Sequence, residues 1–277
     1  MASSSTDEQR KVRTVNLTVP TSWGELNQKQ LRTVFDLLAL EEDHTAVKTL
    51  ALIAFTGIKV QRRTRWGWSC LVNVDGKDEI IDLKTWMVQS FIHQLDYIDQ
   101  VETMDCRLDA VCGLHAVDGL LYRGVTFEEY LFVEKYFQQF LNTRNMDWLD
   151  NVAMWLYQDK SGRAAGYGDA VGDNGKVVRE MTLTPGERVG TLLWYSHVKR
   201  VMAERFPHFF RTVATDEDGE PEKVNFLDQY NVQLRALTDG DPTKEKAVLA
   251  LNCWRALTEL DAKAREAEEL EKIRKEK

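Results

Sequence analysis

The hydrophobic pattern of the chain is mostly helical. Apolar residues recur every three or four positions, which is the spacing of one face of an α-helix. Several of these stretches follow a capping box, in which Ser, Thr or Asn stands three positions before Glu or Gln. Such pairs are Ser22 with Glu25, Asn27 with Gln30, Thr126 with Glu129, and Thr184 with Glu187. We expect helices over 27–38, 45–55, 85–97, 126–141, 148–156, 184–202 and 226–237.

Two regions change to the alternation that is typical of strands. Val15, Leu17 and Val19 alternate with polar residues until Pro20, which predicts a short N-terminal strand. The stretches 66–74 and 77–83 flank Asp-Gly at positions 75 and 76, a strong signal for a two-residue hairpin. The predicted fold class is therefore mainly α (α+β): a helical bundle-like domain with a small β-hairpin and a short N-terminal strand.

The stretch 235–260 predicts a corner between two helices. Gly240 suits the left-handed conformation that ends a helix, Asp241 can cap the next helix, and Pro242 fits its first turn. Leu249, Cys253, Leu257 and Leu260 then continue at helical spacing, with Trp254 beside them. We expect one long second helix here, and expect this pair to be the scaffold for the rest.

The charge and glycine patterns predict a single domain at 14–260 with two segments that flank it and two loops or turns within it. Residues 1–13 are polar and predict a flexible arm, and 160–181 predict a flexible glycine-rich loop that turns at 173–175. A short acidic run at 216–220 lacks calcium-loop spacing and predicts a solvated turn. The end, 261–277, is a densely charged helix end; Leu270 and Ile273 on one side leave open an amphipathic docking helix.

Composition restricts the class of protein. The 277 residues include 43% hydrophobic and 29% charged residues, ordinary globular values, with a net charge of −8 that disfavours a dedicated nucleic-acid coat. The longest apolar runs, such as 50–55, are too short to cross a bilayer, and the first ten residues lack a signal-peptide core. We therefore expect no membrane partner and a location in the cytoplasm. The sequence leaves the oligomeric state open.

Known catalytic and metal-binding motifs do not occur in the sequence. The four cysteines, Cys70, Cys106, Cys112 and Cys253, have no zinc spacing and predict buried free thiols. The histidines form no His-Glu-x-x-His motif, there is no Gly-x-Ser-x-Gly elbow, and the glycine-rich loop fails the phosphate-loop pattern. We expect no cofactor, no metal and no enzymatic activity, although an active site assembled from distant residues is invisible to this reasoning.

One basic and aromatic cluster precedes the hairpin. It consists of Lys59, Arg62, Arg63, Arg65, Trp66 and Trp68. Such a mixture can hold phosphates and stack bases, so 62–68 is the candidate region for nucleic-acid contact or for an enzyme site. The favoured interpretation is structural: an exposed edge strand whose arginines prevent unwanted pairing, with tryptophans packed on neighbouring helices.

Three motifs together resemble an uncharacterised protein family of tailed phages and prophages of gut Bacteroidetes. The first is Val-Pro-Thr-Ser-Trp-Gly-Glu-Leu at 19–26, and the second is the aromatic helical hairpin at 127–157. The third joins Arg-Ala-Leu-Thr-Asp-Gly-Asp-Pro-Thr-Lys-Glu at 235–245 with Trp-Arg-Ala-Leu-Thr-Glu-Leu at 254–260. The family offers no catalytic residues to transfer.

The resemblance implies a phage assembly factor. By analogy of layout, we expect a non-enzymatic tail-assembly chaperone that binds another virion or tail protein. A structural virion component, such as a tail or connector protein, is the first alternative. A nucleic-acid binder or enzyme that uses 62–68 is the second.

Overall fold

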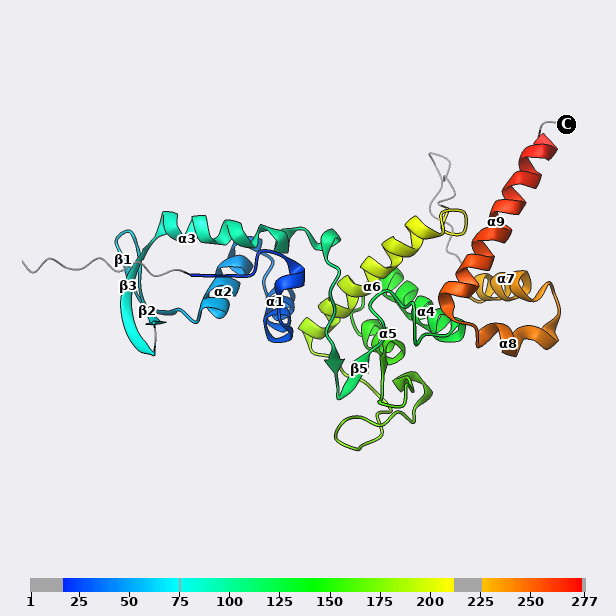
Figure 1. The fold of residues 1–277 in the computed structure, drawn as a ribbon, viewed down its shortest axis with the longest axis horizontal. Helices are drawn as coiled ribbons and strands as arrows, with labels where there is room; N and C mark the ends of the chain where they lie inside the picture. Colours follow the sequence, from blue (N-terminus) through cyan, green and yellow to red (C-terminus); the bar gives the residue numbers. More distant parts are fainter. Residues whose placement is uncertain (1–16, 75, 212–225, 276–277) are drawn as a thin grey trace, which may run out of the picture.

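The computed structural model describes residues 17–74, 76–211 and 226–275. Within them it holds nine α-helices and two three-stranded sheets, which confirms the expected mainly α fold with a smaller β part. Figure 1 shows an elongated molecule with the sheet β1–β3 at one end, helices α4, α5 and α6 in the middle, and α7, α8 and α9 at the other end. The predicted arm at 1–13 and the predicted acidic turn at 216–220 lie outside the described residues.

The N-terminal third begins with helices. Trp23–Glu25 forms a 3-10 turn η1, followed by α1 (Gln28–Leu40) and α2 (His44–Thr56). Asn27 and Gln30 form the expected capping box, whereas Ser22 makes no capping hydrogen bond. Residues 17–20 form no strand, so the expectation there is wrong for the part that is described; Val15 lies outside it. Leu17 packs instead on the small core of the first sheet, and Val19 is buried in the main core.

The hairpin region contains three strands, the predicted hairpin and the edge strand expected from the structural interpretation of the basic cluster. Strands β2 (Gly67–Val74) and β3 (Lys77–Lys84) form the predicted hairpin, with Gly76 at φ 79°. A preceding strand, β1 (Lys59–Thr64), pairs antiparallel with β2 and gives the order β1-β2-β3. Helix α3 (Thr85–Ile92) and the 3-10 segments η2 (His93–Asp99) and η3 (Val101–Thr103) then lead to the centre. The sheet has a small core of its own, made of Ile58, Cys70, Val72 and Leu83.

The centre of the molecule is a group of aromatic helices. Strand β5 (Leu114–Ala116) pairs with β4 (Ala110–Val111) on one side and with β6 (Tyr157–Gln158) on the other. Helices α4 (Phe127–Thr143) and α5 (Trp148–Leu156) form the predicted helical hairpin. Thr126 and Glu129 form the capping box of α4. The aromatic side chains pack on one another; Phe132 and Trp155, for example, stack with ring centroids 4.4 Å apart. The aromatic stripe is therefore core packing.

Helix α6 (Pro185–Arg205) approaches α1 very closely. It begins with the predicted capping box of Thr184 and Glu187. A Cβ atom at Gly190 would lie 2.6 Å from the Phe35 ring, and one at Gly186 would lie 2.0 Å from Oδ1 of Asp36. Glycine at both positions is what allows the two helices to pack at this distance.

The glycine-rich segment is built around one carboxylate. Asp159 accepts hydrogen bonds from the Ser161 hydroxyl and from the amides of Val171, Arg163 and Ser161, and these bonds lower its pKa. A short 3-10 turn, η4 (Ala165–Tyr167), follows, and Val171 pairs with Val177 around the predicted turn at 173–175.

The C-terminal corner differs from the expectation after its first turn. Helix α7 (Phe226–Thr238) is followed by Gly240, which has the expected left-handed conformation with φ 78°. Asp241 caps η5 (Pro242–Lys244), as predicted. The expected long second helix is interrupted, however: α8 (Glu245–Leu249) is separate from α9 (Cys253–Lys275). At the break, Leu251 accepts a hydrogen bond from the Phe127 amide and the Cys253 amide donates to Val125.

The helices of the C-terminal corner were expected to be the scaffold of the molecule, but they lie at one of its ends. Helices α7, α8 and α9 stand at one end of the molecule, and the middle is formed by α4, α5 and α6 with α1 against α6 (Figure 1). The corner is therefore a terminal attachment and not the scaffold. Trp254 is only half-buried; its indole N–H donates to the Leu120 carbonyl over 2.7 Å.

Candidate interaction surface

The predicted basic cluster lies on the edge strand β1 and on the turn that follows it. Lys59, Arg62 and Arg63 are exposed on β1, and none of them forms an ion pair within the described residues. Arg65 and Trp66 occupy the tight turn between Thr64 and Gly67, and the Arg65 guanidinium lies 4.9 Å from the centre of the Trp66 ring. The structure thus brings the six predicted residues together at one end of the molecule.

The two tryptophans of the cluster have different surroundings. Trp68 is half-buried and packs against the small core of the sheet, as the structural interpretation expected. Trp66 is 68% exposed, so the expectation that it packs on a helix is wrong. Trp66 lies in the tight turn that joins β1 to β2, and this position leaves most of the side chain in solvent. The next residue is glycine because β2 and β3 approach so closely that a Cβ at Gly67 would lie 1.9 Å from the Leu83 carbonyl oxygen.

A second exposed tryptophan stands close by. Trp86, at the start of α3, is 65% exposed. Trp66, Trp86, Lys84, Thr85 and Gln89 line an open groove of about 490 Å³. The Trp66 carbonyl holds the start of α3 by accepting from the Thr85 amide over 2.9 Å. Two indoles and one ammonium group thus form an exposed contact surface at this end.

An apolar cavity of about 140 Å³ lies beneath the sheet. Leu52 and Ile53 of α2, and Trp68 and Cys70 of β2, are among the residues that line it. Its walls offer almost no polar groups, so it suits a single apolar side chain or a small apolar molecule. Burial raises the pKa of the Cys70 thiol, which keeps the thiol protonated and unreactive at neutral pH.

The four cysteines differ in how far they are buried. Cys70 and Cys253 are buried free thiols, as expected, and Cys106 is half-buried. Cys112 is exposed, which contradicts the expectation for this residue. It lies in the tight turn between β4 and β5 with φ 51°, and its thiol is 4.0 Å from the Thr182 carbonyl oxygen.

The second predicted contact region is the end of α9. Asp261 accepts hydrogen bonds from the amides of His208 and Phe209, and Glu268 pairs with both His208 and Arg211 at 3.2 Å. These contacts hold α9 as far as Glu268. Beyond them Leu270 and Ile273 are 60% and 51% exposed on the part of the helix that projects from the body (Figure 1).

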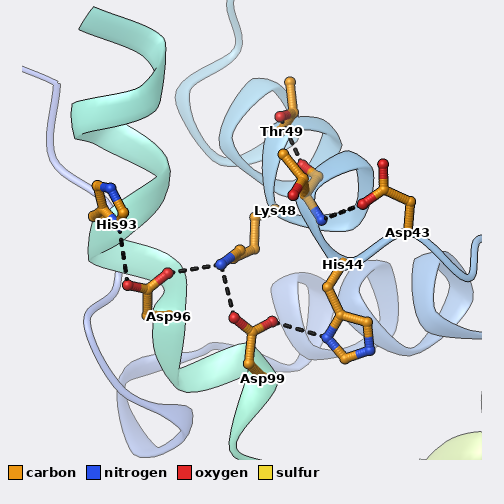
Figure 2. A network of polar contacts seen from close by, with 8 residues as sticks. Asp43, His44, Lys48, Thr49, His93, Asp96 and Asp99 are labelled. Carbon is orange, nitrogen blue, oxygen red and sulfur yellow. Dashed lines mark hydrogen bonds and ion pairs between the residues drawn. The ribbon is translucent and has the colours of Figure 1, made fainter. Parts of the chain in front are cut away.

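A polar network that sequence reasoning missed joins α2 to η2. The Lys48 ammonium lies 2.7 Å from a carboxylate oxygen of Asp96 and 2.7 Å from one of Asp99, while His44 and His93 hold the outer oxygens of the two carboxylates (Figure 2). Burial opposes the charge on Lys48, but the hydrogen bonds to Asp96 and Asp99 outweigh it and raise its pKa. The hydrogen bond from Lys48 in turn lowers the pKa of Asp96. A lysine that stays charged between two carboxylates is a clamp rather than a nucleophile or base.

Another network of polar side chains lies between α4 and α6. The buried Tyr195 hydroxyl donates to Glu134, and the Lys199 ammonium lies 2.7 Å from the other oxygen of that carboxylate. Burial raises the pKa of Tyr195 well above its usual value. A phenol that stays neutral and a carboxylate already paired with lysine hold the two helices together and offer no acid–base pair tuned to neutral pH.

Comparisons with known proteins add no relative. No family model, no curated protein and no solved structure matches the chain. In the described part of the chain, no group of three or more His, Cys, Asp or Glu residues is placed to hold a metal ion. Among the same residues, no helix is both long enough and apolar enough to cross a membrane.

Proposed function

We propose that the protein is a non-enzymatic assembly factor of a tailed phage, with the role of a tail-assembly chaperone in the host-cell cytoplasm. One observation carries the proposal: both ends of the elongated molecule expose large apolar side chains. Trp66, Ile80 and Trp86 are exposed at the sheet end, and Leu270 and Ile273 at the end of α9. Apolar side chains gathered at a surface mark sites of protein–protein contact. The resemblance of the three sequence motifs supplies the phage context.

The α9 end fits the partner-binding step. Its apolar residues lie on a helix that is anchored at Asp261 and Glu268 and unsupported afterwards. Such a helix can place Leu270 and Ile273 in an apolar groove of a virion protein without rearrangement of the body. The last turn is basic, with Lys272, Arg274 and Lys275, so the groove is expected to have an acidic rim.

Mass spectrometry of phage material tests the proposal. An affinity-tagged chain is expressed during phage or prophage growth, and tail precursors and purified particles are analysed separately. We expect the chain together with one virion protein in the precursor fraction and its absence from finished particles. Stoichiometric presence in finished particles would instead establish the structural-component alternative.

A pair of variants connects this result to α9. Leu270→Asp with Ile273→Asp removes the exposed apolar residues and should abolish recovery of the virion protein. Glu269→Gln with Lys272→Gln changes exposed residues of the same helix and leaves the apolar pair intact, so it should preserve recovery. Equal recovery with both variants would remove α9 from the binding site.

A further inference from the structure

The two edges of the β1–β3 sheet carry opposite charge. The order β1-β2-β3 makes β1 one edge and β3 the other. Strand β1 contains Lys59, Arg62 and Arg63 and no acidic residue. The middle of β3 carries three acidic residues, Asp78, Glu79 and Asp82. Asp78 and Asp82 are exposed, and Ile80 between them is 72% exposed.

The strand register places these charges on the same row of the sheet. Arg62 is the partner of Ser69, and Ser69 is the partner of Asp82. Direct partners on neighbouring strands point to the same face, so Arg62 and Asp82 share one face at opposite edges. Two strand spacings, about 10 Å, separate their backbones, and no ion pair joins the two residues.

This distribution disfavours symmetric pairing of equal edges. If two copies met through β1 and β1, the cations of one would lie close to the cations of the other. Pairing β3 with β3 would bring the six carboxylates of the two strands together, with only Lys77 and Lys84 at the ends of each strand to offset them. Pairing β3 of one copy with β1 of the next places Asp82 beside Arg62 instead. Both strands run antiparallel to β2 and hence parallel to each other, so the joined edges form a parallel pair between separate chains.

We propose that a second copy of this chain docks on the sheet, with its β3 edge against the β1 edge of the first copy. The contact is head-to-tail, so the pair keeps one free β1 edge and one free β3 edge, and further copies can add. The charge complementarity of Arg62 with Asp82 sets the register, and main-chain hydrogen bonds between the edges supply the remaining attraction. The competing explanation is that the charges, and the irregularity of β1 between Val60 and Arg62, only protect the edges from pairing.

Sedimentation equilibrium of the purified full chain tests the proposal. We expect an average mass above the monomer value of 32.0 kDa that rises with protein concentration. Added salt should lower the average mass, because exposed ion pairs are screened. A wild-type chain that remains at the monomer mass at high concentration and low salt would overturn the proposal and establish edge protection.

Charge reversal identifies the edges. Arg62→Glu and Asp82→Lys should each weaken self-association by about three- to tenfold, because each places like charges on the shared row. An equal mixture of the two variants should regain association. In that mixture the two introduced side chains face each other at one junction, and the native Arg62 and Asp82 face each other at the next. The recovery also shows that both variants are folded.

Three results separate this contact from others. Arg179→Glu reverses an exposed cation in the glycine-rich region, remote from the sheet in sequence, and should leave association unchanged. If Asp82→Lys associates as strongly as the wild type, β3 is not in the contact and the proposal fails. If the neutral variants Arg62→Gln and Asp82→Asn leave both the average mass and its salt dependence unchanged, the ion pair does not set the register and the proposal likewise fails.

Discussion

Two glycines that face open space separate the effect of backbone conformation from that of packing. Gly240 has φ 78° and Gly24 an ordinary negative φ, and no heavy atom lies within 4 Å of a Cβ built at either position. Gly240→Val should therefore lower the free energy of unfolding by about 1–2 kcal/mol, the cost of a left-handed β-branched residue. Gly24→Val is the matched control and should cost less. Denaturant unfolding measures both; equal stability of Gly240→Val and the wild type would contradict the corner conformation.

Residue-level signals were predictable where their partners are close in sequence. The capping boxes at Asn27, Thr126 and Thr184 formed as expected, because each needs only a side chain and an amide three positions away. The exposure of Trp66 and Trp86 was not predictable in this way. Their exposure depends on where the sheet ends relative to the helices. The spacing of an aromatic residue predicts a core position whether or not another element covers that residue in the folded chain.

At the scale of elements, the pairings and breaks that depend on distant residues escaped prediction. Strand β6 forms because Tyr157 and Gln158 pair with β5, far earlier in the chain. Strand β1 pairs locally with β2, and its place at the sheet edge was expected from its arginines. The break between α8 and α9 arises because residue 251 pairs with Phe127, far away in the chain. Local periodicity continues through that break, so the sequence alone predicts one helix.

The clamp between α2 and η2 gives a test at the same scale. Lys48→Met removes the cation and leaves Asp96 and Asp99 facing each other, so the melting temperature should fall at neutral pH. The control Lys29→Met removes an exposed lysine on α1 that forms no ion pair within the described residues, and it should have little effect.

The loss caused by Lys48→Met should depend on pH. The pKa of Asp96 is lowered by Lys48 and His93, so its stabilisation is present above the unfolded-state pKa of about 3.9 and is lost as the pH falls. The pKa of Lys48 is raised, so its stabilisation persists below about pH 10.4 and is lost at higher pH. The gap in melting temperature between wild type and Lys48→Met should be widest between these limits and narrow on both sides. A gap that is independent of pH would show that Lys48 acts through packing of its methylene chain.

At the scale of the whole molecule, charge decides how the basic edge interacts with nucleic acid. The chain carries a net charge of −8, and screening confines the effect of distant acids to about 10 Å in ordinary salt, so the local surface matters most. There the acids of β3 share the sheet with the cations of β1, and Arg65 already covers the Trp66 ring on which a base would stack. We therefore expect no complex with single- or double-stranded DNA in a gel-shift titration at physiological salt and micromolar protein. A salt-sensitive complex that Arg62→Ala with Arg63→Ala abolishes would reverse this conclusion, because phosphate binding loses affinity steeply as salt rises. In that case the exposed end of the sheet would be a nucleic-acid site, and Trp66 and Trp86 would be its stacking platforms.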